Sequence, residues 1–81
     1  MAPYTVHKGR RYAATVRLSF FQSVASNEIV ADKFREVGFT NVEVTGSGRT
    51  RHAKGSWTHD DVSAEIPDEV SDIRDVGLIE V

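Results

Sequence analysis

The sequence predicts one α+β domain whose elements follow the order β-α-β-β-α-β and form a four-stranded antiparallel sheet with two helices on one face. Three observations carry this prediction. A segment with alternating apolar residues is followed by an amphipathic segment, and then by a second alternating segment that leads into a glycine-rich turn. These three segments lie within residues 12–45, and a chain of 81 residues has room for a single domain.

The first alternating segment opens the domain at residue 11. Its apolar residues share one parity, which is the pattern of a half-buried strand: Tyr12, Ala14, Val16, Leu18 and Phe20. Residues 1–10 have little pattern, and Pro3 and Gly9 oppose regular structure there. We therefore expect a flexible N-terminal lead-in over 1–10 and the domain over 11–81.

An amphipathic helix is predicted over residues 27–37. Its apolar positions recur at spacings of four and three: Val30, Phe34 and Val37. Ser26 or Asn27 can cap the start of this helix, and Gly38 stands where a left-handed C-terminal cap is wanted. Both ends of the helix are therefore marked in the sequence.

A hairpin is predicted after this helix. Residues 40–45 alternate as a second strand, and Gly46-Ser47-Gly48 is a turn signal. A third strand follows over residues 49–58, and it contributes little to the core beyond Ala53 and Trp57.

The last part of the chain is acidic. Residues 58–66 predict a short second helix with Asp60 and Asp61 at its positive end, and Pro67 stops it. Residues 68–81 then predict the fourth strand, with Val70 and Ile73 fixing the turn that leads into it, and this strand completes the sheet.

This order of elements resembles the ferredoxin-like sandwich over about residues 11–79, a scaffold that serves many unrelated functions. The run from Tyr12 through Gly38-Phe39 to Val44, with its glycine-rich turn and following strand, is also similar to the first half of SPOR-type domains. That second resemblance implies binding of cell-wall glycan. The chain departs from the SPOR pattern because its second helix is short, acidic and broken by Pro67, and because it lacks the membrane anchor that often accompanies the family.

Composition and motifs argue against several classes of function. The chain has no cysteine, which excludes disulfides, thiolate nucleophiles and cysteine-based zinc sites. His7, His52 and His59 are far apart and lack a ligand at helical spacing, and no Gly-x-Ser-x-Gly elbow is present. We expect no catalytic residues, no metal and no cofactor. With no secretory signal and no apolar run of about 18 residues, we expect a cytoplasmic protein that does not enter the membrane.

Charge is distributed unevenly, although the net charge is only −2. Residues 1–54 contain nine Lys or Arg and four acids, whereas residues 55–81 contain one Arg and eight acids. The basic part and the acidic part can form surfaces that match within one molecule or between copies, or the basic part can form a face that binds a polyanion. Segregation of charge on an ordinary solvated surface also accounts for the pattern.

The third predicted strand is basic on both parities, and an exposed hairpin tip there is the best candidate site. The candidate interface or polyanion-binding residues are Arg49, Arg51, His52, Lys54, Arg17, Trp57 and Phe21. The same charges can instead protect an edge strand from pairing with other sheets. Phe21 either caps the entry to the helix or lies exposed at an interface.

These observations predict a small non-enzymatic protein–protein interaction module. We expect self-association, with the basic third strand of one copy facing the acidic residues 60–75 of another, or binding of another protein. A rival hypothesis is nucleic-acid binding through the hairpin 49–54 with Arg10 and Arg11. A SPOR-like glycan binder and a small enzyme whose site lies between subunits are two further hypotheses.

Overall fold

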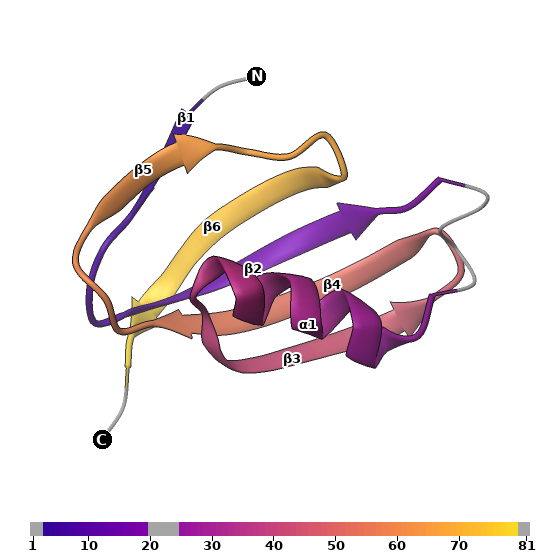
Figure 1. Cartoon of the computed structure of the whole chain (residues 1–81), viewed down its shortest axis with the longest axis horizontal. Coiled ribbons are helices and arrows are strands. Elements are labelled where there is room, and N and C mark those ends of the chain that lie inside the picture. Colours follow the sequence, from indigo (N-terminus) through magenta and orange to yellow (C-terminus); the bar gives the residue numbers. More distant parts are fainter. Residues whose placement is uncertain (1–2, 20–24, 80–81) are drawn as a thin grey trace.

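The computed structural model describes residues 3–19 and 25–79, which form six strands and one helix (Figure 1). In chain order these elements are β1 (Pro3–Val6), β2 (Arg10–Arg17), α1 (Asn27–Val37), β3 (Thr40–Ser47), β4 (Thr50–Trp57), β5 (Val62–Glu65) and β6 (Val70–Leu78). Four strands make an antiparallel sheet in the order β3-β4-β2-β6, and β1 and β5 make a separate two-stranded antiparallel ribbon.

The predicted ferredoxin-like fold with two helices is wrong. The described chain is mostly β, with two sheets and a single helix. The second helix expected over residues 58–66 is absent from this described segment, which instead holds a loop and β5. A helix of two turns is marginal in water, whereas β5 satisfies its backbone groups by pairing with β1. Residues 3–6, expected to belong to a flexible lead-in, supply that partner strand.

Helix α1 spans the predicted residues, and both of its caps are local. The Ser26 hydroxyl accepts a hydrogen bond from the Ile29 N–H at 3.2 Å. At the other end Gly38 has φ of 129°, and its N–H reaches the carbonyls of Phe34 and Arg35. The side that α1 turns towards the sheet buries Val30 and Ala31.

The hairpin between β3 and β4 is present where the glycines predicted a turn. Gly46 and Ser47 belong to β3, while Gly48 and Arg49 form the turn itself. Gly46 lies opposite Arg51 in β4. The glycine-rich stretch thus ends β3 and begins the turn that leads into β4.

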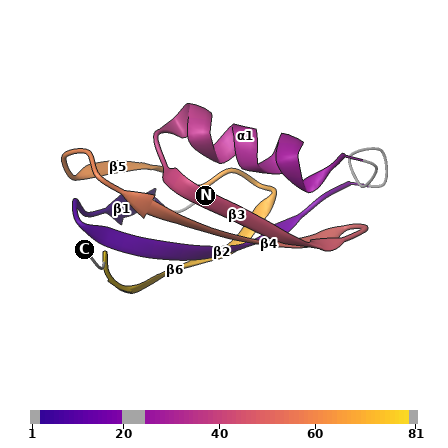
Figure 2. The ribbon, with the colours of Figure 1, turned by 90° about the horizontal axis from the view of Figure 1, so that it is seen from below.

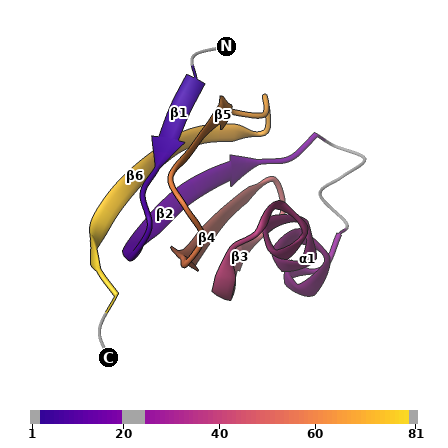
Figure 3. The same cartoon turned by 60° about the vertical axis from the view of Figure 1, so that its left-hand side comes forward.

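The core lies on the face of the four-stranded sheet that α1 covers. Alternate residues of β2 point into it, and Tyr12 is the most buried of them at 2% exposure. One buried cluster surrounds Tyr12, Phe39 and Trp57, and a second surrounds Val16 and Ala53. Figure 2 shows α1 on one side of this sheet, and Figure 3 shows the β1–β5 ribbon and α1 lying apart from each other. One helix therefore leaves part of the core face for the ribbon to cover.

Candidate functional site

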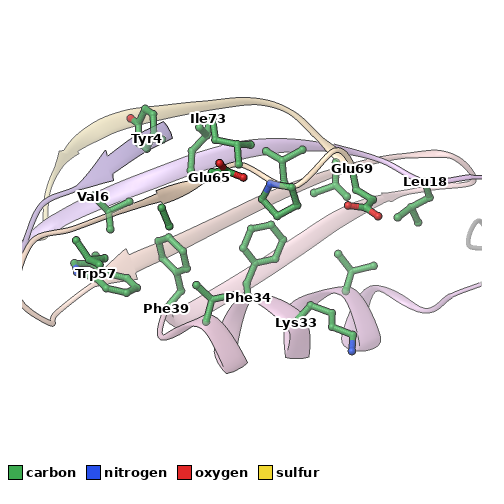
Figure 4. A pocket seen from close by; sticks show the side chains of 18 of the residues that line it. Tyr4, Val6, Leu18, Lys33, Phe34, Phe39, Trp57, Glu65, Glu69 and Ile73 are labelled. Atoms are coloured by element: carbon green, nitrogen blue, oxygen red, sulfur yellow. The ribbon is translucent and has the colours of Figure 1, made fainter. Parts of the chain in front are cut away.

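An apolar groove opens between α1 and the segment that runs from β5 to the start of β6 (Figure 4). Its volume is about 550 Å³, within the range of pockets that hold small-molecule ligands. Among the described residues that line it, all but Lys33, Glu65 and Glu69 have apolar or aromatic side chains. We call this feature the apolar groove.

The floor of the apolar groove is part of the packed core. Val16 belongs to β2, Leu18 directly follows that strand, and Trp57 is the last residue of β4. The rings of Phe39 and Trp57 meet edge to face with centroids 5.0 Å apart, and Phe34 meets Phe39 in the same way. Interlocked aromatic rings give the groove a well-defined floor.

The walls of the apolar groove leave large apolar side chains in water. Ile29 and Val37 lie two turns apart on the exposed side of α1, and they are 53% and 67% exposed. Val62 of β5 faces the same groove and is 44% exposed. A contiguous exposed apolar surface of this kind is a feature of interaction sites.

The two rims of the groove carry opposite charge. Lys33 lies on α1 between Ile29 and Val37, while Glu65 and Glu69 lie on the opposite rim (Figure 4). The Lys33 ammonium is 3.8 Å from the Glu36 carboxylate, and both side chains are about 70% exposed. Such an exposed pair contributes little, so Lys33 can turn to another carboxylate at small cost.

The β1–β5 ribbon is held in place by polar contacts at its base. The Asp61 carboxylate lies 2.8 Å from the His7 ring nitrogen and accepts a hydrogen bond from the Lys8 N–H, also at 2.8 Å. The contact with His7 and the hydrogen bond from the Lys8 N–H both lower the pKa of Asp61 from its ordinary value. The Tyr12 hydroxyl accepts the His7 N–H at 2.7 Å, which joins the same turn to the core. The wall of the groove is thereby fixed to the main sheet.

Two of the candidate residues from the sequence are buried on the groove side of the sheet. Arg51 is only 3% exposed, and its guanidinium donates to the Asn27 side chain at 2.8 Å and to the Gly48 carbonyl at 3.1 Å. The expectation that Arg51 lies exposed at the hairpin tip is therefore wrong. Trp57 is 5% exposed and donates its indole N–H to the Asp60 carbonyl at 2.9 Å.

The other candidates are scattered. Arg17, His52 and Lys54 are exposed and lie on the face of the sheet that α1 does not cover, as their register with β2 and β4 requires. Arg49 is exposed in the hairpin turn and donates to the Leu18 carbonyl at 3.3 Å. Phe21 lies outside the described residues. The structure brings Trp57 to the groove floor and groups Arg17, His52 and Lys54 on the opposite face.

The cations proposed for a basic N-terminal arm also separate. Arg10 forms an ion pair with Asp75, with Nε–Oδ2 of 2.8 Å and a second hydrogen bond of 3.0 Å. Together with His7–Asp61, this contact joins the basic part of the sequence to its acidic part within one molecule. Arg11 is exposed and lies on the same face as Arg17.

Trp57 was a candidate from the sequence, but the groove itself and its two rims were missed. Ile29 widens the apolar side of α1 beyond the predicted stripe of Val30, Phe34 and Val37, and Val37, the last residue of that stripe, is 67% exposed. That excess was the available signal. Glu65 and Glu69 gave none, because acids in an acidic segment do not reveal which of them will border an apolar surface.

Comparison of the chain with protein-family models, with curated proteins and with solved structures found no match. Within residues 3–19 and 25–79, no three His, Asp or Glu side chains are grouped so that they could hold a metal ion. In the same described part, α1 is neither long nor apolar enough to cross a membrane, and there is no other helix.

Proposed function

We propose that this chain is a non-enzymatic module that self-associates, with a second copy of the chain seated on the apolar groove. The observation that carries this proposal is the opposite charge of the two rims. Lys33 stands on one side of the groove, and Glu65 and Glu69 stand on the other. A partner that matches this surface must be apolar in the middle, acidic on one side and basic on the other, and the chain itself meets that description.

Two-fold symmetry makes the match reciprocal. In a symmetric dimer the same surface is used by both copies, so each contact occurs twice. Ile29 and Val37 of one copy enter the groove of the other, and Lys33 between them meets Glu65 and Glu69 of that copy. The division of the sequence into a basic part and an acidic part supports this arrangement, because Lys33 belongs to the first and both glutamates to the second.

A stable dimer buries more surface than the apolar groove alone offers, so its interface also takes in the surface around the groove. A standard interface buries about 800 Å² on each partner, which is about 15% of the 5433 Å² of accessible surface of this chain. Burying exposed apolar side chains also offsets a weakness of small domains, which cover only a modest part of their apolar surface. Self-association therefore stabilises each copy as well as joining them.

The test exchanges the charges of the two rims. Absolute molar mass is measured by light scattering during size exclusion for the natural chain, for Lys33→Glu and for the double variant Glu65→Lys with Glu69→Lys. We expect the natural chain to have about twice the 9.0 kDa mass of one chain. In a homodimer of either variant, like charges would face each other at both ends of the interface, so we expect each variant alone to be monomeric. An equimolar mixture of the two variants restores opposite charges at both ends and should form a heterodimer.

Two controls separate the groove from the rest of the surface. Lys8→Glu makes the same charge change in the exposed turn before β2 and should leave the mass of the natural chain unchanged. Ile29→Asp places a polar group in the apolar wall and should prevent dimerisation, while an acid in the first turn of α1 favours the helix. A monomeric natural chain, a monomer carrying a small apolar molecule in native mass spectrometry, or a mixture of variants that fails to associate would each overturn the proposal.

A further inference from the structure

The face of the four-stranded sheet opposite α1 carries a line of basic side chains. No described element covers this face (Figure 2). The register of β2 with β4 places alternate residues of the two strands on this face in four pairs: Arg11 with Ser56, Ala13 with Lys54, Thr15 with His52, and Arg17 with Thr50. Each pair contains one basic residue and one small or hydroxyl-bearing residue. We call these four pairs the basic ladder.

The spacing of the basic ladder is regular. Successive pairs on one face of a sheet are two residues apart, or about 6.6–6.8 Å, so the four pairs extend over about 20 Å. Arg11, Arg17, His52 and Lys54 are exposed, whereas Ala13 and Ser56 opposite two of them are buried, so the basic side chains form the outer surface of the ladder. A linear polyanion with regularly spaced charges matches this arrangement.

Acidic residues are confined to the two edge strands. Neither β2 nor β4 contains Asp or Glu. At one edge Glu43 of β3 lies opposite Lys54, and at the other Asp72 of β6 accepts a hydrogen bond from Arg74 at 2.8 Å. The middle of the face is thus positive although the chain as a whole has a net charge of −2.

Aromatic residues are missing from the basic ladder. The described aromatic side chains lie in the core cluster or beside it on the other side of the sheet: Tyr4, Tyr12, Phe34, Phe39 and Trp57. Proteins that read single-stranded bases stack them on aromatic rings, and the ladder has none to offer. Its exposed cations and the exposed Thr50 hydroxyl are suited to phosphate oxygens and carry no base selectivity.

We propose that the basic ladder binds the sugar-phosphate backbone of nucleic acid without sequence preference. Three permanent cations make the contacts: Arg11, Arg17 and Lys54. Arg10 and Arg51 do not contribute, because Arg10 is paired with Asp75 and Arg51 is buried on the other side of the sheet. The ladder and the apolar groove lie on opposite faces, so this inference does not rest on the proposed self-association.

The test is a fluorescence-anisotropy titration of labelled oligonucleotides with the full chain over a range of salt concentrations. Three phosphate contacts predict a slope of log K against log salt of about −3 for duplex DNA and about −2 for a single strand. Lys54→Gln should make the duplex slope shallower by about 1, and Arg11→Gln combined with Lys54→Gln by about 2. Lys8→Gln removes one exposed charge away from the ladder and should leave the slope unchanged. Two duplexes of unrelated sequence should bind equally.

Several results would overturn this assignment. Absence of binding at the lowest salt concentration would do so, as would a slope that Lys54→Gln does not change. A preference for one base sequence would contradict recognition through the backbone. Equal binding of a polyglutamate peptide would show a general affinity for anions instead of one for phosphate backbones.

Discussion

The buried guanidinium of Arg51 donates a hydrogen bond to the side-chain oxygen of Asn27, 2.8 Å away, and so joins β4 to the first residue of α1. The same guanidinium donates to the Gly48 carbonyl at 3.1 Å, and the Asn27 amide donates to the Gly46 carbonyl at 3.1 Å. The start of the helix is therefore attached to both strands of the hairpin. An arginine can be buried here because its donors find acceptors.

Replacing Arg51 by Met should destabilise the protein. The change keeps most of the apolar stem but removes the donors that Asn27 and the Gly48 carbonyl use, which should lower the free energy of unfolding by about 1.5–3 kcal/mol. Urea denaturation followed by the fluorescence of Trp57, the single tryptophan of the chain, measures the loss. Lys54→Met is the matched control, since Lys54 is exposed on the other face of the same strand and should change stability by no more than about 0.5 kcal/mol. Equal losses for the two variants would contradict a structural role for Arg51.

Gly38→Ala should be more costly than Gly48→Ala. Both glycines have positive φ, at 129° and 69°, so each substitution strains the backbone. A Cβ on Gly38 would also lie 3.0 Å from two ring atoms of Trp57, whereas one on Gly48 would meet nothing within 4 Å. We expect a loss of about 2–4 kcal/mol for Gly38→Ala and about 1 kcal/mol for Gly48→Ala. The two variants are compared by urea denaturation, and a similar loss at both sites would show that Trp57 moves aside freely.

Stability should fall in acid because two carboxylates are partnered only when ionised. The Arg10 guanidinium, and after it the Gly77 N–H, hold the pKa of Asp75 below its ordinary value, and His7 and the Lys8 N–H lower the pKa of Asp61. A carboxylate whose pKa is lower in the folded state than in the unfolded state stabilises the protein at pH values above its unfolded pKa of about 3.9. That contribution is lost as the pH falls through the folded value.

The variant Asp75→Asn tests this pH dependence. It lacks one titrating group, so its free energy of unfolding should decline less steeply below about pH 4 than that of the natural chain. Denaturation curves collected across this range for both proteins give the comparison. Parallel pH profiles would mean that the Arg10–Asp75 contact does not contribute to stability in solution.

Removing the N-cap of α1 should weaken the start of the helix. Ser26→Ala leaves the Ile29 N–H without its acceptor and should cost about 1 kcal/mol, while Ser26→Asp should retain most of the stability. Amide hydrogen exchange at Ile29 reports the effect locally and should be faster in the alanine variant alone. Unchanged exchange at Ile29 in Ser26→Ala would show that another group takes over the cap.

Local signals account for what could be predicted from the sequence. Helix α1 was predicted correctly because Ser26 and Gly38 mark its ends and its apolar spacing lies within one short segment. The hairpin followed from the glycines around Ser47. The prediction of a helix over residues 58–66 was wrong. Asp60 and Asp61 are typical of a helix start, but the structure of this segment depends on pairing with residues 3–6 at the far end of the chain.

The candidate site was harder to predict, for a related reason. The parity of β4 placed Arg51 with Ala53 and Trp57, yet its charge suggested exposure, and its partners Asn27 and Gly48 come from other elements. The apolar groove exists because one helix and a narrow ribbon leave part of a sheet face uncovered. This uncovered area depends on how the helix and the ribbon pack on the sheet, so it cannot be predicted from any single segment of the sequence.

The pairing of β1 with β5 also sets an order of folding. Thr5 meets Ser63 at a separation of 58 positions, whereas α1 and the β3–β4 hairpin form from neighbouring residues. Contacts between distant segments carry the larger loop-closure entropy and form late. Until β1 and β5 pair, Trp57 lacks Val6 of β1, a member of the same buried cluster, and its ring is more exposed to water. Partly folded chains would then present the same uncovered apolar surface to one another before either has formed its own wall.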